Sequence, residues 1–410
     1  MKLFRAVQPI YHYCLTLLAA IIYRFPSRKI KVIAVTGTKG KTSTIELINA
    51  ILEEAGYTTA LSSTLRFKVG EQTERNLYKM TMPGRFFMQW FLRRAVREKC
   101  DYAIVEMTSE GAKLFRNKFI AIDTLIFTNI TPEHIESHGS YEKYLDAKLS
   151  IARSLQSSKK KHRTIIANKD DKEADKFLNI KVEEKHTYSL SDAKPYALKK
   201  DTLTMHLCGK EVTSHLSGIF NVYNILAAST LAKTQDVRDE TIIRAIEKFS
   251  GIRGRMEHVN EGQDFTAVVD YAHTPESLEK VYETFGQSKL ICVLGGTGGG
   301  RDTEKRQVMG GIASKHCSHI ILTNEDPYDE DPEKIVLDIA EGINRPIHET
   351  VMNRREAIAK ALSMADTGDS VVITGKGTDP YIMGPNGSKE KWDDAEVVRE
   401  ELKKVISKSI

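Results

Sequence analysis

The stretch Ile30–Thr42 decides the fold, and it reads Ile-Lys-Val-Ile-Ala-Val-Thr-Gly-Thr-Lys-Gly-Lys-Thr. Residues 30–35 are mostly apolar and rich in β-branched side chains, which predicts a strand buried on both faces. Residues 42–55 then show helical spacing and end at Gly56. A strand, a glycine-containing turn and a helix in this order predict a phosphate-binding loop. Glycines let backbone N–H groups approach phosphate oxygens, and a helix N-terminus favours negative charge.

The side chains of this loop suit a nucleotide and its metal ion. Lys41 can pair with the β- and γ-phosphates, and Thr42 can offer its hydroxyl to Mg²⁺. The spacing is not the common Walker pattern, because Val35 stands where that pattern has its first glycine. A loop without function is therefore the alternative. We expect ATP to contact the loop residues Thr36, Gly37, Thr38, Lys39, Gly40, Lys41, Thr42 and Ser43.

Composition describes an ordinary globular enzyme. The 410 residues are 41% hydrophobic and 28% charged, and a chain of this length is expected to form two or three domains. The net charge of +5 is small, so it decides little about partners, and we expect no nucleic acid. The five cysteines form no Cys-x-x-Cys pair, which favours a reducing compartment and argues against a zinc site.

Short apolar runs alternate with helix-like stretches along two units, which predicts an α/β fold. We expect a central ATPase domain with a doubly wound, mostly parallel sheet over residues 30–252, and a smaller Rossmann-like α/β domain over residues 253–410. The Gly- and Arg-rich segment 250–255 is the expected hinge, and residues 157–161 and 190–200 are expected surface loops. Expected strands beyond the first are 102–105, 124–127, 266–270, 290–294, 319–322 and 370–374.

Residues 1–29 form an apolar N-terminal segment with an expected helix. Residues 6–23 contain no Asp, Glu, Lys or Arg, yet they only just reach the length of a membrane span and include Pro9. A cleaved signal peptide is not expected, because the phosphate loop that follows must face ATP in the cytosol. The helix therefore packs on the protein's own core or on a partner subunit, or it lies at a membrane surface. The expected location is the cytoplasm, with the inner membrane surface as the alternative.

Further motifs follow the loop in order, and together with it they carry a family resemblance. They are Ala103-Ile-Val-Glu-Met-Thr-Ser-Glu-Gly111, Phe127-Thr-Asn-Ile-Thr-Pro-Glu-His-Ile-Glu-Ser-His-Gly139, Gly218-Ile-Phe-Asn-Val-Tyr-Asn224, Val269-Asp-Tyr-Ala-His-Thr-Pro275 and Gly375-Lys-Gly-Thr-Asp379. The sequence resembles the Mur ligase superfamily from about residue 31 onward. The resemblance is strongest to the MurE-like branch, which adds the third residue of the peptidoglycan stem peptide.

Metal ligands are expected after two strands. Glu106 ends a predicted strand, where a carboxylate near the phosphates suits Mg²⁺, although a surface glutamate is the alternative. The resemblance implies the same role for Glu106. It adds His134 as a ligand of a second Mg²⁺ and a carbamylated Lys148 that helps to hold that ion. Without the resemblance, Lys148 would be an ordinary helix lysine, and the His and Glu residues near 134 a polar helix start.

The resemblance also implies contacts to the nucleotide. Asn221 and Asn224 carry amides that can read a base edge, with a helix N-cap as the alternative for one of them. Arg255 matches an arginine that binds ATP phosphates across the hinge. A weaker match gives Arg354, because Asn353 replaces the usual acid. The expected catalytic residues are Lys41, Lys148, His134, Asp270 and His273.

Acceptor and amine contacts are expected in both domains. The family's Ser-Ser-His is Thr108-Ser109-Glu110 here, and Tyr328 stands where diaminopimelate-adding enzymes have an arginine. Tyrosine cannot grip a distal carboxylate bidentately, and the acids around it favour an ammonium group, so lysine is preferred to diaminopimelate. The expected substrate-binding residues are Thr81, Pro83, Thr108, Ser109, Arg116, Asp326, Tyr328, Asp329, Gly375 and Asp379.

The expected activity is ATP-dependent joining of an amino acid to a muramyl-peptide-like carboxylate through an acyl phosphate. The roughly 30 residues before the first strand are too few for the family's usual UDP-sugar-binding domain, so the acceptor is expected without UDP, on a lipid, or with a partner's help. Two alternatives are a folylpolyglutamate-synthase-like ligase and a non-catalytic ATP-binding scaffold.

Overall fold

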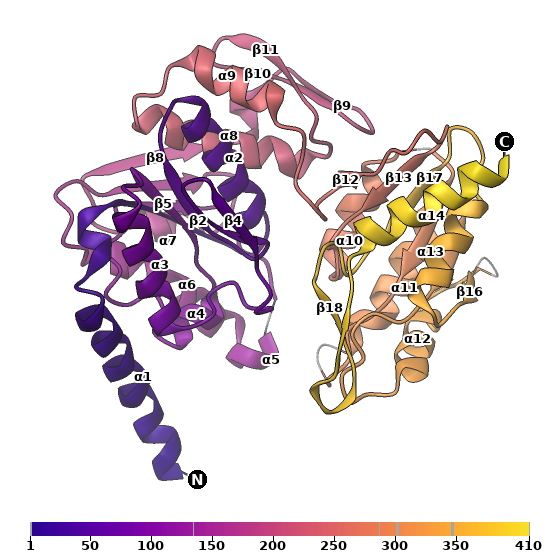
Figure 1. Cartoon of the computed structure of the whole chain (residues 1–410), viewed down its shortest axis with the longest axis horizontal. Helices are drawn as coiled ribbons and strands as arrows, with labels where there is room; N and C mark the ends of the chain where they lie inside the picture. Colours follow the sequence, from indigo (N-terminus) through magenta and orange to yellow (C-terminus); the bar gives the residue numbers. More distant parts are fainter. Residues whose placement is uncertain (1, 134, 287, 301–302, 346–347, 410) are drawn as a thin grey trace. The chain divides into compact units, whose positions relative to one another are not determined.

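The computed structural model describes residues 2–133, 135–286, 288–300, 303–345 and 348–409, which form two compact units (Figure 1). The first unit comprises Met1–Ala197, Leu203–Ser214 and Ile219–Phe249. The second comprises Leu198–Thr202, His215–Gly218 and Ser250–Ile410. We propose that the two units correspond to the ATPase domain and the C-terminal domain expected from the sequence.

The first unit is built on an eight-stranded sheet in the order β4-β3-β2-β5-β1-β6-β7-β8. The six strands β2, β5, β1, β6, β7 and β8 are neighbours in this order, and each pair is parallel. The pairs β2-β3 and β3-β4 are antiparallel. The mostly parallel sheet is thus confirmed. The bounds are β1 Lys31–Thr36, β2 Thr59–Ser62, β3 Arg66–Val69, β4 Gln72–Arg75, β5 Tyr102–Glu106, β6 Thr124–Phe127, β7 Thr164–Asn168 and β8 Glu184–Tyr188.

Helices cover both faces of this sheet, as a doubly wound fold requires. On one face, apolar side chains of β1, β5 and β6 share a core with α3 and α6. Helix α2 packs against the sheet and against α8 and α9, so most of its residues are buried. The bounds are α2 Lys41–Glu54, α3 Arg85–Arg97, α4 Ser109–Lys113, α5 Ile135–His138, α6 Tyr141–Gln156, α7 Ala174–Leu178, α8 Ile219–Thr234 and α9 Asp239–Lys248.

The expectation of a surface loop over residues 190–200 is wrong. That segment contains a short 3-10 helix, Leu190–Ala193, and strand β9, Tyr196–Leu198. The polar residues fix structure here, because Ser189 and Asp192 cap each other's backbone at the start of the 3-10 helix. Strand β9 joins β10, Leu203–Leu207, and β11, Lys210–Ser214, in a three-stranded sheet.

The N-terminal segment forms one helix, α1, over Lys2–Ile22 (Figure 1). It packs against α3, and its residues Ala19 and Ala20 are fully buried. Large apolar side chains of α1 remain exposed at Ile10, Tyr11, Tyr13, Leu18, Ile21 and Ile22. Within the described residues, no helix has the length and hydropathy needed to span a bilayer.

The second unit contains a six-stranded sheet in the order β12-β13-β17-β14-β15-β16, parallel except for the β12-β13 pair. Its strands are β12 Glu257–His258, β13 Thr266–Val269, β14 Leu290–Leu294, β15 His319–Leu322, β16 His348–Thr350 and β17 Ser370–Ile373, with a separate hairpin of β18 Tyr381–Met383 and β19 Lys389–Lys391. Its helices are α10 Pro275–Glu283, α11 Glu304–His316, α12 Pro332–Ala340, α13 Arg354–Ser363 and α14 Asp394–Ser409. The smaller α/β domain predicted from the sequence is confirmed.

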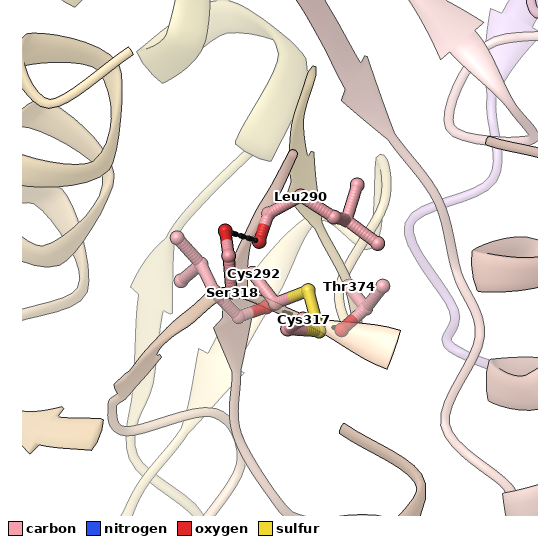
Figure 2. The surroundings of a disulfide bond; sticks show 6 residues. Leu290, Cys292, Cys317, Ser318 and Thr374 are labelled. Atoms are coloured by element: carbon pink, nitrogen blue, oxygen red, sulfur yellow. Dashed lines mark hydrogen bonds between the residues drawn. A yellow bond between two sulfur atoms is a disulfide. The ribbon is translucent and has the colours of Figure 1, made fainter. Parts of the chain in front are cut away.

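A disulfide joins Cys292 in β14 to Cys317, just before β15 (Figure 2). The two strands are parallel neighbours, and the hydroxyl of Ser318 donates a hydrogen bond of 2.9 Å to the carbonyl of Leu290 beside it. The sequence showed no pair, because the cysteines are 25 residues apart and meet only through strand order. Both half-cystines are buried in the sheet.

We expect the denatured, unreduced protein to expose three thiols, since Cys14, Cys100 and Cys208 are free, and five after reduction. Replacing Cys292 and Cys317 together by alanine is expected to lower the free energy of unfolding by about 3 kcal/mol, the order for a loop of this length. Thiol titration in denaturant measures the first quantity and urea unfolding the second. Titration of five thiols without reductant would show that Cys292 and Cys317 do not form a disulfide.

Candidate active site

The phosphate loop follows β1 and ends at Gly40, which precedes the first residue of α2 with a left-handed φ of 79°. A Cβ on Gly37 would lie 1.9 Å from the hydroxyl of Thr128, and one on Gly40 would lie 2.4 Å from the amide oxygen of Asn224. Both positions therefore require glycine. The backbone N–H groups of Thr38 and Lys39 donate to the carbonyl and the side chain of Asn129, which fixes the loop against the end of β6.

Two lysines meet at this loop. The Lys41 ammonium donates to the carbonyl of Thr38 at 2.9 Å, and the Lys148 ammonium, from α6, donates to the carbonyl of Gly37 at 2.6 Å. Lys148 is only 2% exposed and lies 4.7 Å from the centre of the Tyr144 ring. Burial, and then the neighbouring Lys41, hold the pKa of Lys148 well below its ordinary value. The amine of Lys148 is therefore shifted toward its neutral form.

Glu106 and Thr42 form an oxygen-rich cradle beside the loop. Glu106 is 2% exposed at the end of β5, and its carboxylate accepts hydrogen bonds from the Thr42 hydroxyl at 3.0 Å and from the backbone N–H of Thr64 at 2.9 Å. The Thr64 hydroxyl donates to the same carboxylate at 3.1 Å. A carboxylate and a hydroxyl at the start of the helix after a phosphate loop are hard oxygen ligands of the kind that Mg²⁺ takes.

The chain around this cradle offers few other metal ligands. Across the described residues, no group of three or more His, Cys, Asp or Glu side chains is arranged to hold a metal ion. A cation bound at Glu106 and Thr42 would thus take its remaining ligands from water and the nucleotide, as Mg²⁺ does in many phosphate-loop sites. His134, the expected ligand of a second ion, lies outside the described residues.

The amides of Asn221 and Asn224 face α2 from inside α8, so neither caps that helix. Asn224 donates to the amide oxygen of Asn221 at 2.9 Å, and its own oxygen accepts from the hydroxyl of Thr44 at 3.3 Å. The same oxygen lies against Gly40. These two residues therefore hold α8 and α2 together directly behind the phosphate loop.

The expected acceptor residues of the first unit lie in the segments that follow β4 and β5. The Thr81 hydroxyl lies 2.8 Å from that of Thr64, which binds the Glu106 carboxylate. Thr108 caps α4, and Ser109 is buried at its first residue. Arg116 donates to the carbonyl of Met82, the residue before Pro83.

A carboxylate–histidine pair occupies the turn where the family motif differs. Glu110 lies 2.9 Å from the Nε2 of buried His138 and accepts from the hydroxyl of Ser137 at 2.6 Å. This pair could not be foreseen from local sequence, because Glu110 and His138 are 28 residues apart and meet only in the folded chain.

In the second unit, the side chain of Arg354 is buried and bonded to other residues of the same unit. Its buried guanidinium pairs with the carboxylate of Asp394 at 2.7 Å and donates to the carbonyl of Thr374 at 2.8 Å. Motif matching suggested a nucleotide contact, but these partners make Arg354 a structural link between α13, α14 and the end of β17.

The acids expected to attract an amine are partly paired within the unit. Lys376 lies between Asp326 at 2.8 Å and Asp379 at 3.0 Å, and Arg306 lies between Glu330 and Asp338, at 2.7 Å from each. The sequence analysis did not foresee either arrangement. Each cation therefore faces two carboxylates.

The remaining expected amine contacts are Tyr328, Asp329 and Gly375. Tyr328 has a left-handed φ of 53° and lies 3.6 Å from the point a Cβ on Gly299 would occupy, while Asp329 accepts from the backbone of Asn386. A Cβ on Gly375 would lie 2.2 Å from a carboxylate oxygen of Glu325, so glycine is required there. Burial raises the pKa of Glu325.

The last group of expected residues lies near the start of the second unit. The Asp270 carboxylate accepts from the backbone N–H groups of Met256 and Ala272, both at 2.7 Å. His273 Nδ1 lies 2.8 Å from the carbonyl of Tyr271, and the Arg255 guanidinium lies 4.1 Å from the centre of the Tyr271 ring.

A phosphate loop with two lysines and a Thr–Glu cradle, on a doubly wound sheet, defines an enzyme that handles ATP and a divalent cation. Comparison with protein families matches the Mur ligase middle domain over residues 35–232 and the Mur ligase, glutamate ligase domain over residues 254–377. The chain belongs to the Mur ligase family, and it is an ATP-dependent acid–amino-acid ligase. Members of this family use ATP and Mg²⁺.

Three similar proteins are named as ligases or synthetases that act on muramyl peptides. The chain is 36% identical to a UDP-N-acetylmuramoyl-L-alanyl-D-glutamate–2,6-diaminopimelate ligase of Syntrophomonas wolfei over 95% of this chain and 81% of the relative. It is 34% identical to a UDP-N-acetylmuramyl-tripeptide synthetase of Roseiflexus sp. over 94% of this chain and 81% of the relative. A solved diaminopimelate ligase structure superimposes with a TM-score of 0.63 and 29% identity, over 92% of this chain and 78% of that one.

If Arg354 is structural, Arg354→Met and Asp394→Asn are each expected to lower the free energy of unfolding by about 3–5 kcal/mol without nucleotide, because each leaves a buried charge unpaired. Urea unfolding measures this loss. The control Arg355→Met removes an exposed neighbour that pairs with Glu400 and Glu401, and should cost at most about 1 kcal/mol. Unchanged stability with weakened ATP binding in Arg354→Met would instead make Arg354 a nucleotide ligand.

Proposed function

We propose that this ligase activates a carboxylate as an acyl phosphate and transfers the acyl group to an amine. The observation that carries the proposal is the convergence of Lys41, Lys148 and the Thr42–Glu106 cradle on one phosphate loop. An acceptor carboxylate oxygen attacks the γ-phosphorus, and the bond from that phosphorus to ADP breaks. The amine then attacks the acyl carbon, phosphate leaves with the bond oxygen, and the nitrogen loses a proton.

The loop and its lysines would hold the transferring group. Backbone N–H groups at the start of α2 and the Lys41 ammonium place positive charge at the phosphates, which lowers the barrier for phosphoryl transfer. Mg²⁺ at Thr42 and Glu106 would neutralise charge that develops on the phosphoryl oxygens. Thr36 and Ser43 at the two ends of the loop are also proposed as nucleotide contacts. Outside the loop, the proposed nucleotide contacts are Asn221, Asn224, Arg255, Asp270 and His273.

We propose that Lys148 is carbamylated and that, with His134, it helps to hold a second Mg²⁺. A neutral amine is the form that adds to carbon dioxide, and burial already lowers the pKa of Lys148. The resulting carboxylate would lie at the loop carbonyl of Gly37, next to Lys41. The neutral amine would thus become a carboxylate ligand of the kind that Mg²⁺ binds.

The proposed acceptor is a muramyl peptide, with contacts at Thr81, Pro83, Thr108, Ser109 and Arg116. Support comes from the names of the relatives, which act on UDP-N-acetylmuramoyl-L-alanyl-D-glutamate or form a muramyl tripeptide. The 36% identity to a UDP-N-acetylmuramoyl-L-alanyl-D-glutamate–2,6-diaminopimelate ligase extends over both units, which favours a muramyl-peptide acceptor over the substrate of a folylpolyglutamate-type ligase. The intact cradle at Glu106 disfavours a scaffold that only binds ATP.

The proposed amine is lysine or a similar basic amino acid. Two carboxylates lie beside each of the cations Lys376 and Arg306, and they include the expected contacts Asp326 and Asp379. Tyr328 lacks the guanidinium that would bind a second carboxylate. The proposed amine contacts are Asp326, Tyr328, Asp329, Gly375 and Asp379.

We also propose that the exposed apolar side of α1 contacts a membrane surface or a partner protein in the cytoplasm. Ile10, Leu18, Ile21 and Ile22 are each at least 47% exposed, and such a row on a helix whose other side is buried is costly in water.

Lys148→Ala is expected to reduce ligation by about 10²- to 10³-fold, the order for loss of one preorganised electrostatic group. Short carboxylates such as acetate should restore part of the rate, because they can replace the carbamate. Lys143→Ala, an exposed lysine on the same helix, is the matched control and should keep full activity. Loss of activity without rescue by any short acid would remove the carbamate from the mechanism.

Phosphate release is expected only when ATP, Mg²⁺, UDP-N-acetylmuramoyl-L-alanyl-D-glutamate and a basic amino acid are all present. The ligated product is then identified by mass spectrometry in parallel assays with lysine, ornithine, diaminopimelate and glutamate, with Lys41→Ala as the inactive control. Product with diaminopimelate in preference to lysine would overturn the amine assignment. If the protein binds ATP but does not turn it over with the acceptor and any of these amino acids, it is better described as a non-catalytic ATP-binding scaffold.

A further inference from the structure

The exposed apolar residues of α1 form one stripe along the helix. An α-helix turns about 100° per residue, so the exposed positions fall within one side of it. Buried Thr16, Ala19 and Ala20 fall on the opposite side, and α1 packs against α3. Toward its N-terminus the helix extends away from the rest of the first unit (Figure 1). The apolar stripe consists of Ile10, Tyr11, Cys14, Leu18, Ile21 and Ile22.

The chain turns sharply where the stripe ends, and the turn is basic. The backbone N–H of Phe25 donates to the carbonyl of Ala20 at 2.8 Å, which ends the helix. A short 3-10 helix over Pro26–Lys29 follows, in which Arg28 and Lys29 are exposed. The Arg28 guanidinium lies 4.2 Å from the centre of the Phe25 ring. The sequence contains no Asp or Glu before residue 46, so the stripe and the turn carry no acid.

A cavity of about 440 Å³ opens beside this turn. Of its nine lining residues, four are basic and one, Asp101, is acidic. The Lys31 ammonium lies 3.3 Å from the hydroxyl of Tyr102, and Lys160 pairs with Asp123 at 2.8 Å. The basic lining residues are Arg28, Lys29, Lys31 and Lys160. An excess of Lys and Arg in a hollow of this size suits an anionic group such as a phosphate.

The cavity lies at the opposite end of the sheet from the phosphate loop. Its residues Lys31 and Tyr102 begin β1 and β5, whereas the loop follows the carboxyl end of β1. A strand of six residues spans about 17 Å, at about 3.3 Å per residue. An anion in the cavity therefore does not compete with the nucleotide.

We propose that the apolar stripe of α1 and the basic cavity after it bind the surface of a bilayer that contains acidic phospholipid. The stripe would enter the boundary between headgroups and acyl chains, and the cavity would take the phosphate of a headgroup. Apolar side chains next to basic ones are typical of helices that lie in the plane of such a surface. The stripe has no acid that could pair with the basic turn of a second copy, so charge complementarity favours an anionic surface.

Bilayer binding of this kind names the partner of α1 that the proposed function left open, and it rests on that proposal. Ligation of a soluble acceptor does not depend on it, because the cavity and the phosphate loop lie at opposite ends of β1.

Binding is measured on the full chain with vesicles of phosphatidylcholine alone or of phosphatidylcholine and phosphatidylglycerol in equal amounts. Cys14 is a free, exposed cysteine within the stripe, so an environment-sensitive dye attached to it reports entry into lipid. Cys208→Ser removes the other thiol that is not fully buried. We expect the dye emission to shift to the blue, and the protein to sediment, only with vesicles that contain phosphatidylglycerol. Added salt should weaken this binding.

Two pairs of substitutions test the two parts of the surface. Ile10→Gln with Ile21→Gln removes apolar area from the stripe, and Arg28→Gln with Lys29→Gln removes charge from the cavity. Each pair is expected to weaken binding to the acidic vesicles by about tenfold or more. All four side chains are exposed, so the fold is expected to be kept.

The matched control is Leu337→Gln with Lys334→Gln, which removes an exposed apolar and an exposed basic side chain from α12 of the second unit. This variant should bind vesicles as the wild type does. Equal loss in the control, equal binding to neutral and acidic vesicles, or no binding to either overturns the proposal. Self-association that Ile10→Gln with Ile21→Gln abolishes, without vesicle binding, would assign the stripe to a second copy instead.

Ligase assays with a soluble acceptor and no vesicles separate the bilayer contact from the proposed reaction. The stripe and cavity variants should ligate at the wild-type rate. Vesicle binding without any ligation would leave the bilayer contact standing and remove the reaction. Ligation without vesicle binding would do the reverse.

Discussion

The contact on which the rest of the site depends is the hydrogen bond from the buried Lys148 ammonium to the carbonyl of Gly37. Burying an ammonium group beside another lysine costs several kcal/mol, and one carbonyl and the face of Tyr144 offset only part of that cost. The fold nevertheless brings α6 to the loop at this point. A charge kept where it lowers stability is expected of a residue retained for chemistry. That cost is why the pKa of Lys148 is held well below its ordinary value, and the neutral amine that results is the form that carbon dioxide can convert to a carbamate.

Structural features that depend on residues close together in the sequence could be predicted. The run Ile30–Thr42 predicted β1, the loop and α2 within one residue of their observed bounds, because a strand, glycines and helical spacing are all local signals. Pairs that depend on strand order could not be predicted. Thr64 reaches Glu106 only because β2 lies beside β5, and Cys292 reaches Cys317 only because β14 lies beside β15. Local composition carries no record of which strands become neighbours.

The second unit shows how an acid-rich sequence can mislead. Asp326 and Asp379 look from the sequence like free ligands for an amine, yet both bind Lys376, a residue of the same Gly-Lys-Gly motif. Likewise Arg354 looks like a phosphate ligand, although Asp394 neutralises it in the core. Specificity of this kind depends on net charge after internal pairing, which only the three-dimensional structure provides.

The two sides of helix α1 are unfavourable for different reasons. Its exposed side carries apolar groups in water, which contact with an apolar surface would relieve. Its inner side carries His12, where burial of further apolar groups would be unfavourable, because the buried ring nitrogens need hydrogen-bond partners. No single partner relieves both sides. The exposed side of α1 is thus stabilised by an apolar surface, and its inner side by hydrogen-bond acceptors.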